Sequence, residues 1–237
     1  MFRGGHRSGS GPSVLDVTSR LCLDVNVLFA DLRGKVQRLR PTACSDLVSY
    51  ATTGRFPGGA TQLIISVPMI EQWESVLQRH FGYNRSDASE AAWLLHDIAK
   101  EGPLPFSTLV VVGSGFVPFA SEQEAEAAAR GRASRASGEE AGRIFDEIED
   151  DRHVLLTAVA GRADILVTTN MRDFRRGKLL EFDREDMFVV PAPDHHLVVG
   201  TPGFATHWLR QGIIPNWNLV SSRGNEFRLK ATGLEEP

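Results

Sequence analysis

Acidic and amide side chains recur where short apolar runs end and where helical patterns begin. Asp24 lies late in the apolar run LCLDVNVLF, at residues 21–29. A buried carboxylate without a partner is unstable or takes up a proton, so Asp24 is a stronger functional candidate than an acid at a helix start. The other candidates follow a predicted strand or open a predicted helix, and they are Glu71, Glu74, Asp151, Asn170 and Asp173.

Acids in these positions are suited to binding a divalent cation. The carboxyl ends of parallel strands and the helix starts that follow them share one edge of a sheet, so acids far apart in sequence can meet there. Closely gathered carboxylates do not all stay ionised without a cation. Ligands that are all oxygen select Mg²⁺ or Mn²⁺ over zinc, and such sites commonly act on phosphate esters. The structural alternative is that the helix-start acids only favour the helix dipole and that Asp24 bonds a neighbouring loop.

The elements that would position these residues alternate between strands and helices. Four apolar runs rich in β-branched residues predict strands that are covered on both faces, as in a parallel sheet. They are residues 21–29, 62–67, 106–113 and 164–169, and a further strand-like piece, HLVVG, spans 196–200. This alternation predicts an α/β fold with a central parallel sheet.

Helical patterns separate the strands. The segment 42–54 ends at Gly54, and the segment 68–82 opens with Pro68 and stops at Gly82. Further helical patterns cover 86–102, the segment DDRHVLLTAVAGRA that begins at 150, and the short amphipathic segment 202–212. Each helix therefore follows or precedes a predicted strand.

Composition predicts one domain with extensions. The chain has 237 residues and a formal net charge of -4, and no apolar run approaches the ~20 residues of a membrane span. We expect a disordered Gly/Ser/Arg-rich leader over 1–18, a single domain over 19–213 with an Ala-rich insert at about 120–140, and a C-terminal tail over 214–237. Two cysteines make no disulfide framework, which together with the lack of a secretory signal predicts a cytoplasmic protein.

Several other chemistries find no support in the residue spacing. No two of the seven histidines have zinc-ligand spacing on one helix face, and no cysteine pair supports a zinc site. The GSG at 113–115 lacks the remaining glycine of a dinucleotide-binding loop, and no serine lies in a nucleophile elbow.

Three segments in order resemble the PIN-domain nucleases, and within them the toxin-like ribonucleases of the VapC type. LCLDVNVLF resembles the family's first strand with its Asp-x-Asn, and IISVPMIEQWESVLQR resembles the second strand and the glutamate-bearing helix. DDRHVLLTAVAGRADILVTTNMRDF resembles the Asp-led helix, the last core strand and the ending that follows it. The resemblance covers about residues 21–174.

The resemblance implies a three-layer α/β/α PIN-like fold and a cluster of acids that holds one or two Mg²⁺ or Mn²⁺ ions. Carried over by position, the first acid is Asp24, the third is Asp151, and the fourth falls on Asn170 with Asp173 close by. Asn26 and Thr168 would orient ligands or water.

The second acid departs from the family pattern. The helix glutamate aligns with Gln72, which Glu71 and Glu74 flank. Either flanking glutamate supplies the carboxylate, or the amide oxygen of Gln72 serves as a weaker ligand.

The resemblance implies a metal-dependent endoribonuclease, a hydrolase that acts on RNA and that fits the toxin of a type II toxin–antitoxin pair. The expected partners are RNA, an antitoxin protein and a second copy of the chain. Basic clusters at 33–40 and 172–178 fit phosphate contact or a solvated loop, and the residues we assign to RNA are Arg172, Arg175, Arg176 and Lys178. The alternatives are a PIN-fold protein that binds RNA or protein without cutting, and a phosphatase or DNA flap nuclease that uses the same acids.

Overall fold

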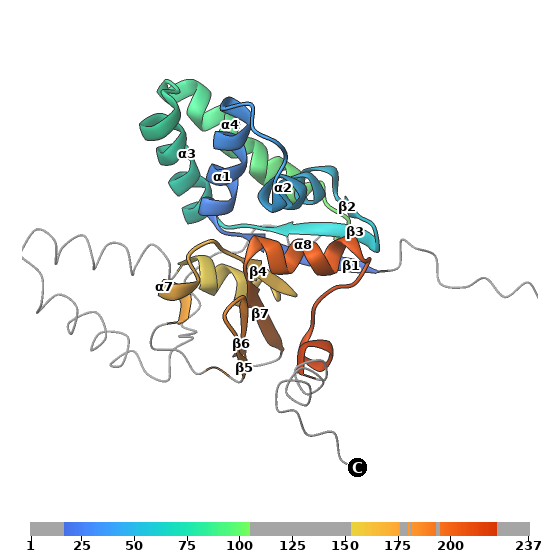
Figure 1. Cartoon of the computed structure of the whole chain (residues 1–237). Coiled ribbons are helices and arrows are strands. Elements are labelled where there is room, and N and C mark those ends of the chain that lie inside the picture. The colour runs from blue at the N-terminus through green and yellow to red at the C-terminus, as the bar shows by residue number, and fades with distance from the viewer. Residues whose placement is uncertain (1–16, 105–152, 176–179, 181, 193–194, 222–237) are drawn as a thin grey trace, which may run out of the picture.

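The computed structural model describes residues 17–104, 153–175, 180, 182–192 and 195–221 (Figure 1). Residues 1–16 of the predicted leader, the strand predicted at 106–113, the Ala-rich insert, Asp151, Arg176 and Lys178 lie outside these residues. The leader was predicted to extend to residue 18, but β1 already begins at Thr18. No helix in the described ranges is long and apolar enough to cross a membrane.

A seven-stranded mixed sheet organises the fold, in the order β2-β3-β1-β4-β7-β6-β5. Its parallel core consists of β1 (Thr18–Leu23), β3 (Gly59–Ile64), β4 (Ile165–Val167) and β7 (His196–Gly200). The predicted α/β class is confirmed, and the strand at 196–200 is confirmed at its predicted bounds.

The central parallel sheet that the sequence predicted is extended at both edges by antiparallel strands, so the whole sheet is mixed. The two-residue strand β2 (Arg55–Phe56) runs antiparallel to β3, and β6 (Met187–Pro191) runs antiparallel to both β5 (Phe182–Asp183) and β7. The chain reverses direction between β6 and β7, so these strands pair as neighbours without a crossover helix.

The apolar run at 21–29 is not one strand. β1 ends at Leu23, and α1 (Val25–Val36) begins directly after it with Asp24 as its N-cap. The Asp24 side chain accepts a hydrogen bond from the Asn26 backbone N–H, which is the usual interaction of a helix N-cap. A continuous apolar run cannot distinguish a buried strand from a buried helix start, and α1 was therefore missed.

The other described helices match their sequence patterns within about two residues. They are α2 (Ala43–Thr53), α3 (Val67–Phe81), α4 (Arg85–Lys100) and α8 (Pro202–Arg210). Gly54 and Gly82 end α2 and α3 in the left-handed conformation, which glycine adopts without strain. A five-residue helix, α7 (Met171–Arg175), follows β4, and residues 153–160 are helical.

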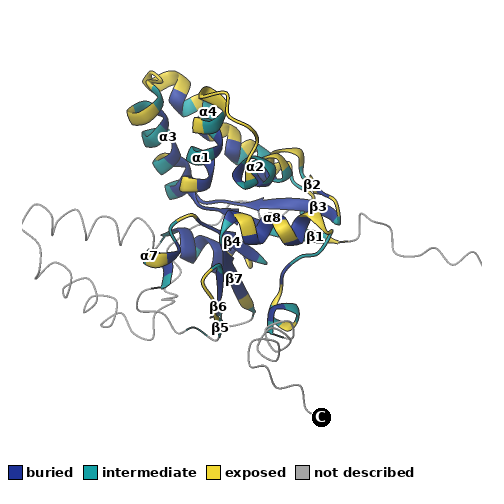
Figure 2. Cartoon of the chain, viewed as in Figure 1, coloured by how far each residue is buried: buried dark blue, intermediate teal, exposed yellow. Residues whose placement is uncertain are grey.

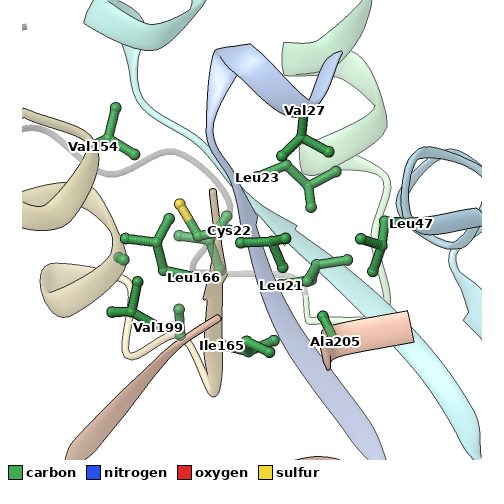
Figure 3. Packing of buried hydrophobic residues seen from close by; sticks show 14 of the residues in the cluster. Leu21, Cys22, Leu23, Val27, Leu47, Val154, Ile165, Leu166, Val199 and Ala205 are labelled. Carbon is green, nitrogen blue, oxygen red and sulfur yellow. The ribbon is translucent and has the colours of Figure 1, made fainter. Parts of the chain in front are cut away.

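The core lies between the sheet and the helices packed alongside it. Figure 1 shows α1–α4 gathered along one side of β1 and β3, with α7 beside the other half of the molecule. Figure 2 shows that the central strands are almost wholly buried, while the outer helix surfaces are exposed. Figure 3 shows Leu21, Cys22 and Leu23 of β1 among side chains from helices, such as Val27 and Val154. Both cysteines are free and buried.

Candidate functional site

Asp24 is a buried carboxylate at the carboxyl end of β1. Its exposed fraction is 2%, and the Asp24 backbone N–H bonds the carbonyl of Val167 at the end of β4. The side chain accepts hydrogen bonds from the Asn26 backbone N–H at 3.3 Å, from Asn26 Nδ2 at 3.2 Å and from Thr168 Oγ1 at 2.6 Å. Fixed donors therefore hold the carboxylate in one orientation.

The environment of Asp24 opposes its ionisation despite these donors. Burial raises the pKa of Asp24 above its ordinary value, while the hydrogen bonds from Thr168 and Asn26 and the nearby His153 act in the opposite direction. Desolvation is the largest of these effects. A cation bound beside this carboxylate would favour the ionised form and offset the cost of burial.

A chain of hydrogen bonds links Asp24 to the residues that follow β4. Thr168 Oγ1, which donates to Asp24, accepts from the Asn170 backbone N–H at 2.9 Å. Asn170 Nδ2 in turn donates to Asp173 Oδ2 at 2.7 Å. Four residues that the sequence placed at two strand ends are thus connected, although Thr168 lies 144 positions after Asp24.

The start of α3 distinguishes the three candidates for the second ligand. Glu71 is exposed, and Glu74 Oε1 accepts from Gln78 Nε2 at 3.2 Å along the same helix. Gln72 Oε1 is buried and has no hydrogen-bond partner among the described residues. An acceptor buried without a donor is costly, and a metal ion is one group that would satisfy it. Of the three candidates on this helix, Gln72 is thus the one with a buried side-chain oxygen that lacks a described partner.

The helix at 153–160 approaches the same region. Thr157 Oγ1 donates to Ser66 Oγ, the N-cap residue of α3, at 2.8 Å. His153 lies close enough to Asp24 to lower the pKa of that carboxyl. His153 and the Thr157–Ser66 bond were missed from the sequence. The signal for His153 was its position two residues after Asp151 in the Asp-led segment.

The described residues alone do not form a metal site built from acidic side chains. Within the described ranges, no three His, Cys, Asp or Glu side chains are arranged to hold a metal ion. The hydrogen-bonded chain that begins at Asp24 nevertheless contains three side chains with possible ligand oxygens, namely the carboxylates of Asp24 and Asp173 and the amide of Asn170. These oxygens suit a hard cation such as Mg²⁺ or Mn²⁺.

The two described residues of the predicted RNA-binding cluster differ in their surroundings. Arg172 is exposed on α7. Arg175 forms an ion pair with Asp183 Oδ1 at 3.0 Å, donates to the Glu185 carbonyl at 2.8 Å and to the Arg184 carbonyl, and lies over the Phe188 ring. Arg175 therefore fixes α7 to the β5–β6 pair, and Arg172 is the more accessible cation.

No protein-family model matches the chain, and no curated protein matches it.

Proposed function

We propose that the chain is a metal-dependent endoribonuclease with a three-layer PIN-like fold, acting in the cytoplasm as the toxin of a toxin–antitoxin pair. The observation that carries the proposal is the buried Asp24 carboxylate, joined through Thr168 and Asn170 to Asp173 across the ends of β1 and β4. This is the edge of a parallel sheet where ligands usually bind. The order of motifs that resembles the PIN-domain nucleases supports the same reaction.

Mg²⁺ or Mn²⁺ would be held by Asp24, by Asp173 or Asn170, by Asp151 and by the Gln72 amide oxygen. A bound divalent ion supplies Lewis-acid polarisation of a phosphoryl oxygen and lowers the pKa of water. Thr168 and Asn26 keep the Asp24 carboxylate oriented, which preserves ligand geometry without rearrangement. Arg172 offers a phosphate contact beside this site, and Arg176 and Lys178 extend the cluster in sequence.

The proposal is tested by incubating the full chain with an end-labelled pool of structured RNA, with Mn²⁺ or with EDTA. We expect internal cleavage only with the metal, and a loss of rate of at least about 100-fold in Asp24→Asn. Asp97→Asn is the matched control, because Asp97 is an exposed acid on α4. Metal-independent cleavage, or equal rates in parent and Asp24→Asn, would contradict the proposal.

A second candidate function is RNA or protein binding without cleavage. The observation that favours it is Gln72, since a neutral amide oxygen holds a hard cation less well than a carboxylate. Under this alternative the chain retains RNA in a filter-binding assay with Mn²⁺ present and leaves the RNA intact.

A further inference from the structure

A cavity lies at the opposite edge of the sheet from Asp24. It has a volume of about 560 Å³, and its walls include Thr18 at the start of β1, Asp164 just before β4 and His196 at the start of β7. Asp24 follows the other end of β1. A six-residue strand is ~20 Å long, so the two sites are separate.

The charged groups of this cavity favour an anion. Arg20 and Arg162 line it, and Arg20 Nη1 donates to the Gly161 carbonyl at 3.2 Å, which fixes the guanidinium at the sheet edge. The carboxylate among the lining residues, Asp164, accepts from the Arg20 backbone N–H at 2.7 Å. Burial raises the pKa of Asp164, while Arg20 and His195 lower it. With two guanidinium groups and one carboxylate, the described walls are net positive.

Two aromatic side chains, Trp217 and His196, line the cavity together with these arginines. Trp217 stacks on His196, with ring centroids 5.4 Å apart and planes 14° apart, and Phe182 meets Trp217 edge-on at 6.4 Å. Asn216 and Asn218 flank Trp217 in the lining. The cavity therefore combines a flat aromatic surface, carboxamides that both donate and accept hydrogen bonds, and guanidinium groups.

We propose that this cavity binds a nucleoside monophosphate unit. Guanidinium groups bind phosphate oxygens through paired N–H donors, and nucleobases stack on indole and imidazole rings. The Asn216 and Asn218 carboxamides can bond the polar edge of a base. A volume of about 560 Å³ is within the range of small-molecule sites. The unit is either a free nucleotide or one nucleotide of a single-stranded RNA. This site does not depend on the proposed nuclease activity, because it shares no residue with the Asp24 region.

Calorimetric titration of the full chain in EDTA tests the proposal, using the four 5′-ribonucleoside monophosphates, with uridine and inorganic phosphate as the separated halves. We expect saturable binding of at least one monophosphate, and weaker binding of each half. Arg162→Gln and Trp217→Ala should each weaken that binding by at least about tenfold, as expected for loss of a charged hydrogen bond or a stacking ring. The matched controls are Arg79→Gln and Trp93→Ala, which remove an exposed arginine and a partly exposed tryptophan elsewhere.

Two further variants and a competing RNA distinguish the possible causes of these results. Trp217→Phe keeps a ring and should bind within a few-fold of the parent, which guards against a folding defect in Trp217→Ala. Asp24→Asn should bind the nucleotide as the parent does, so failure of the nuclease proposal leaves this result unchanged. A short single-stranded RNA that displaces the mononucleotide identifies RNA as the source, and lack of displacement identifies a free nucleotide. Absence of binding by all four monophosphates, or equal affinity in Arg162→Gln and the parent, would overturn the proposal.

Discussion

Asp24 draws its three hydrogen-bond donors from two places, Asn26 on its own helix and Thr168 at the end of β4. Neither residue is charged, so together they orient the carboxylate without neutralising it. The consequence is a buried acid whose pKa is raised mainly by desolvation. Such a group destabilises the metal-free fold once it ionises, which is typical of a residue kept for binding rather than for stability.

Asp24→Asn should therefore change how stability depends on pH in EDTA. Because the folded-state pKa of Asp24 is raised above 3.8, the folded protein keeps a proton that the unfolded chain has lost. The contribution of Asp24 to stability is complete below pH 3.8 and is lost as pH rises through the raised pKa. We expect the Tm of Asp24→Asn, minus that of the parent, to increase over this window and then to level off. A difference that stays constant with pH would show that the pKa is not raised.

Gln72→Glu tests whether Gln72 or Glu74 is the side chain of α3 that binds the metal ion. The buried oxygen of Gln72 has no described partner, while Glu74 already bonds Gln78. We expect Gln72→Glu to tighten Mn²⁺ binding by about tenfold in calorimetry, because a carboxylate attracts a hard cation more than an amide does. Glu74→Gln is the matched control and should be nearly silent. Lost affinity in Glu74→Gln, with no gain in Gln72→Glu, would assign the role to Glu74.

At the scale of elements, Gln62 joins β3 to α4. Gln62 is fully buried, and its Nε2 donates to the carbonyls of Leu63 and Ala99 at 2.9 Å each. Its Oε1 accepts from the Leu104 backbone N–H at 3.0 Å, and Gly102 lies so close that an added Cβ would meet this amide. One side chain thus satisfies the backbone groups where α4 ends.

Gln62→Leu should therefore destabilise the protein by about 1–3 kcal/mol, because it leaves buried backbone groups without partners. Urea unfolding at equilibrium measures the change in the free energy of unfolding. Gln211→Ala, at the exposed end of α8, is the control and should change it by less than about 0.5 kcal/mol. Equal changes in the free energy of unfolding for the two substitutions would show that the hydrogen bonds of Gln62 do not stabilise the end of α4.

The elements that the sequence predicted well carried local signals. Gly54 and Gly82 marked the ends of α2 and α3, and the apolar runs of β4 and β7 marked buried strands. α1 was missed because its first turn continues the apolar run of β1, and the periodicity of a short run does not separate the two. β6 was missed although its run MFVVP is as apolar as that of β7. The antiparallel pairing of β6 with β7 depends on the reversal between them, which a local pattern does not reveal.

At the scale of the whole molecule, the parallel core explains why a site could be anticipated at all. β1 and β4 are parallel neighbours, so the residues that follow them must meet at one edge. That rule predicted that Asp24 would lie close to Asn170 and Asp173, whereas Thr168 was a candidate only through the resemblance to the PIN-domain nucleases. It could not predict that Arg175 would pair with Asp183, nor which side chain of α3 has a buried oxygen, because both depend on how α7 and α3 pack.

The carboxyl and amino edges of the parallel strands carry side chains of different chemical character. The carboxyl edge carries Asp24 and its uncharged donors, and the amino edge carries Arg20, Arg162 and the Trp217–His196 stack. The first is suited to a cation and the second to an anion with a flat ring. A nuclease with a separate nucleotide site would use both edges of one sheet.

The central claim is that Asp24 binds a divalent metal ion, and calorimetric titration of the full chain with Mn²⁺ at neutral pH tests it most directly. We predict saturable binding to the parent and to Asp97→Asn. Asp24→Asn should bind at least about tenfold more weakly, because the buried carboxylate is the main anionic ligand among the described residues. Equal Mn²⁺ affinity in Asp24→Asn and the parent, or no Mn²⁺ binding by the parent, would contradict the account.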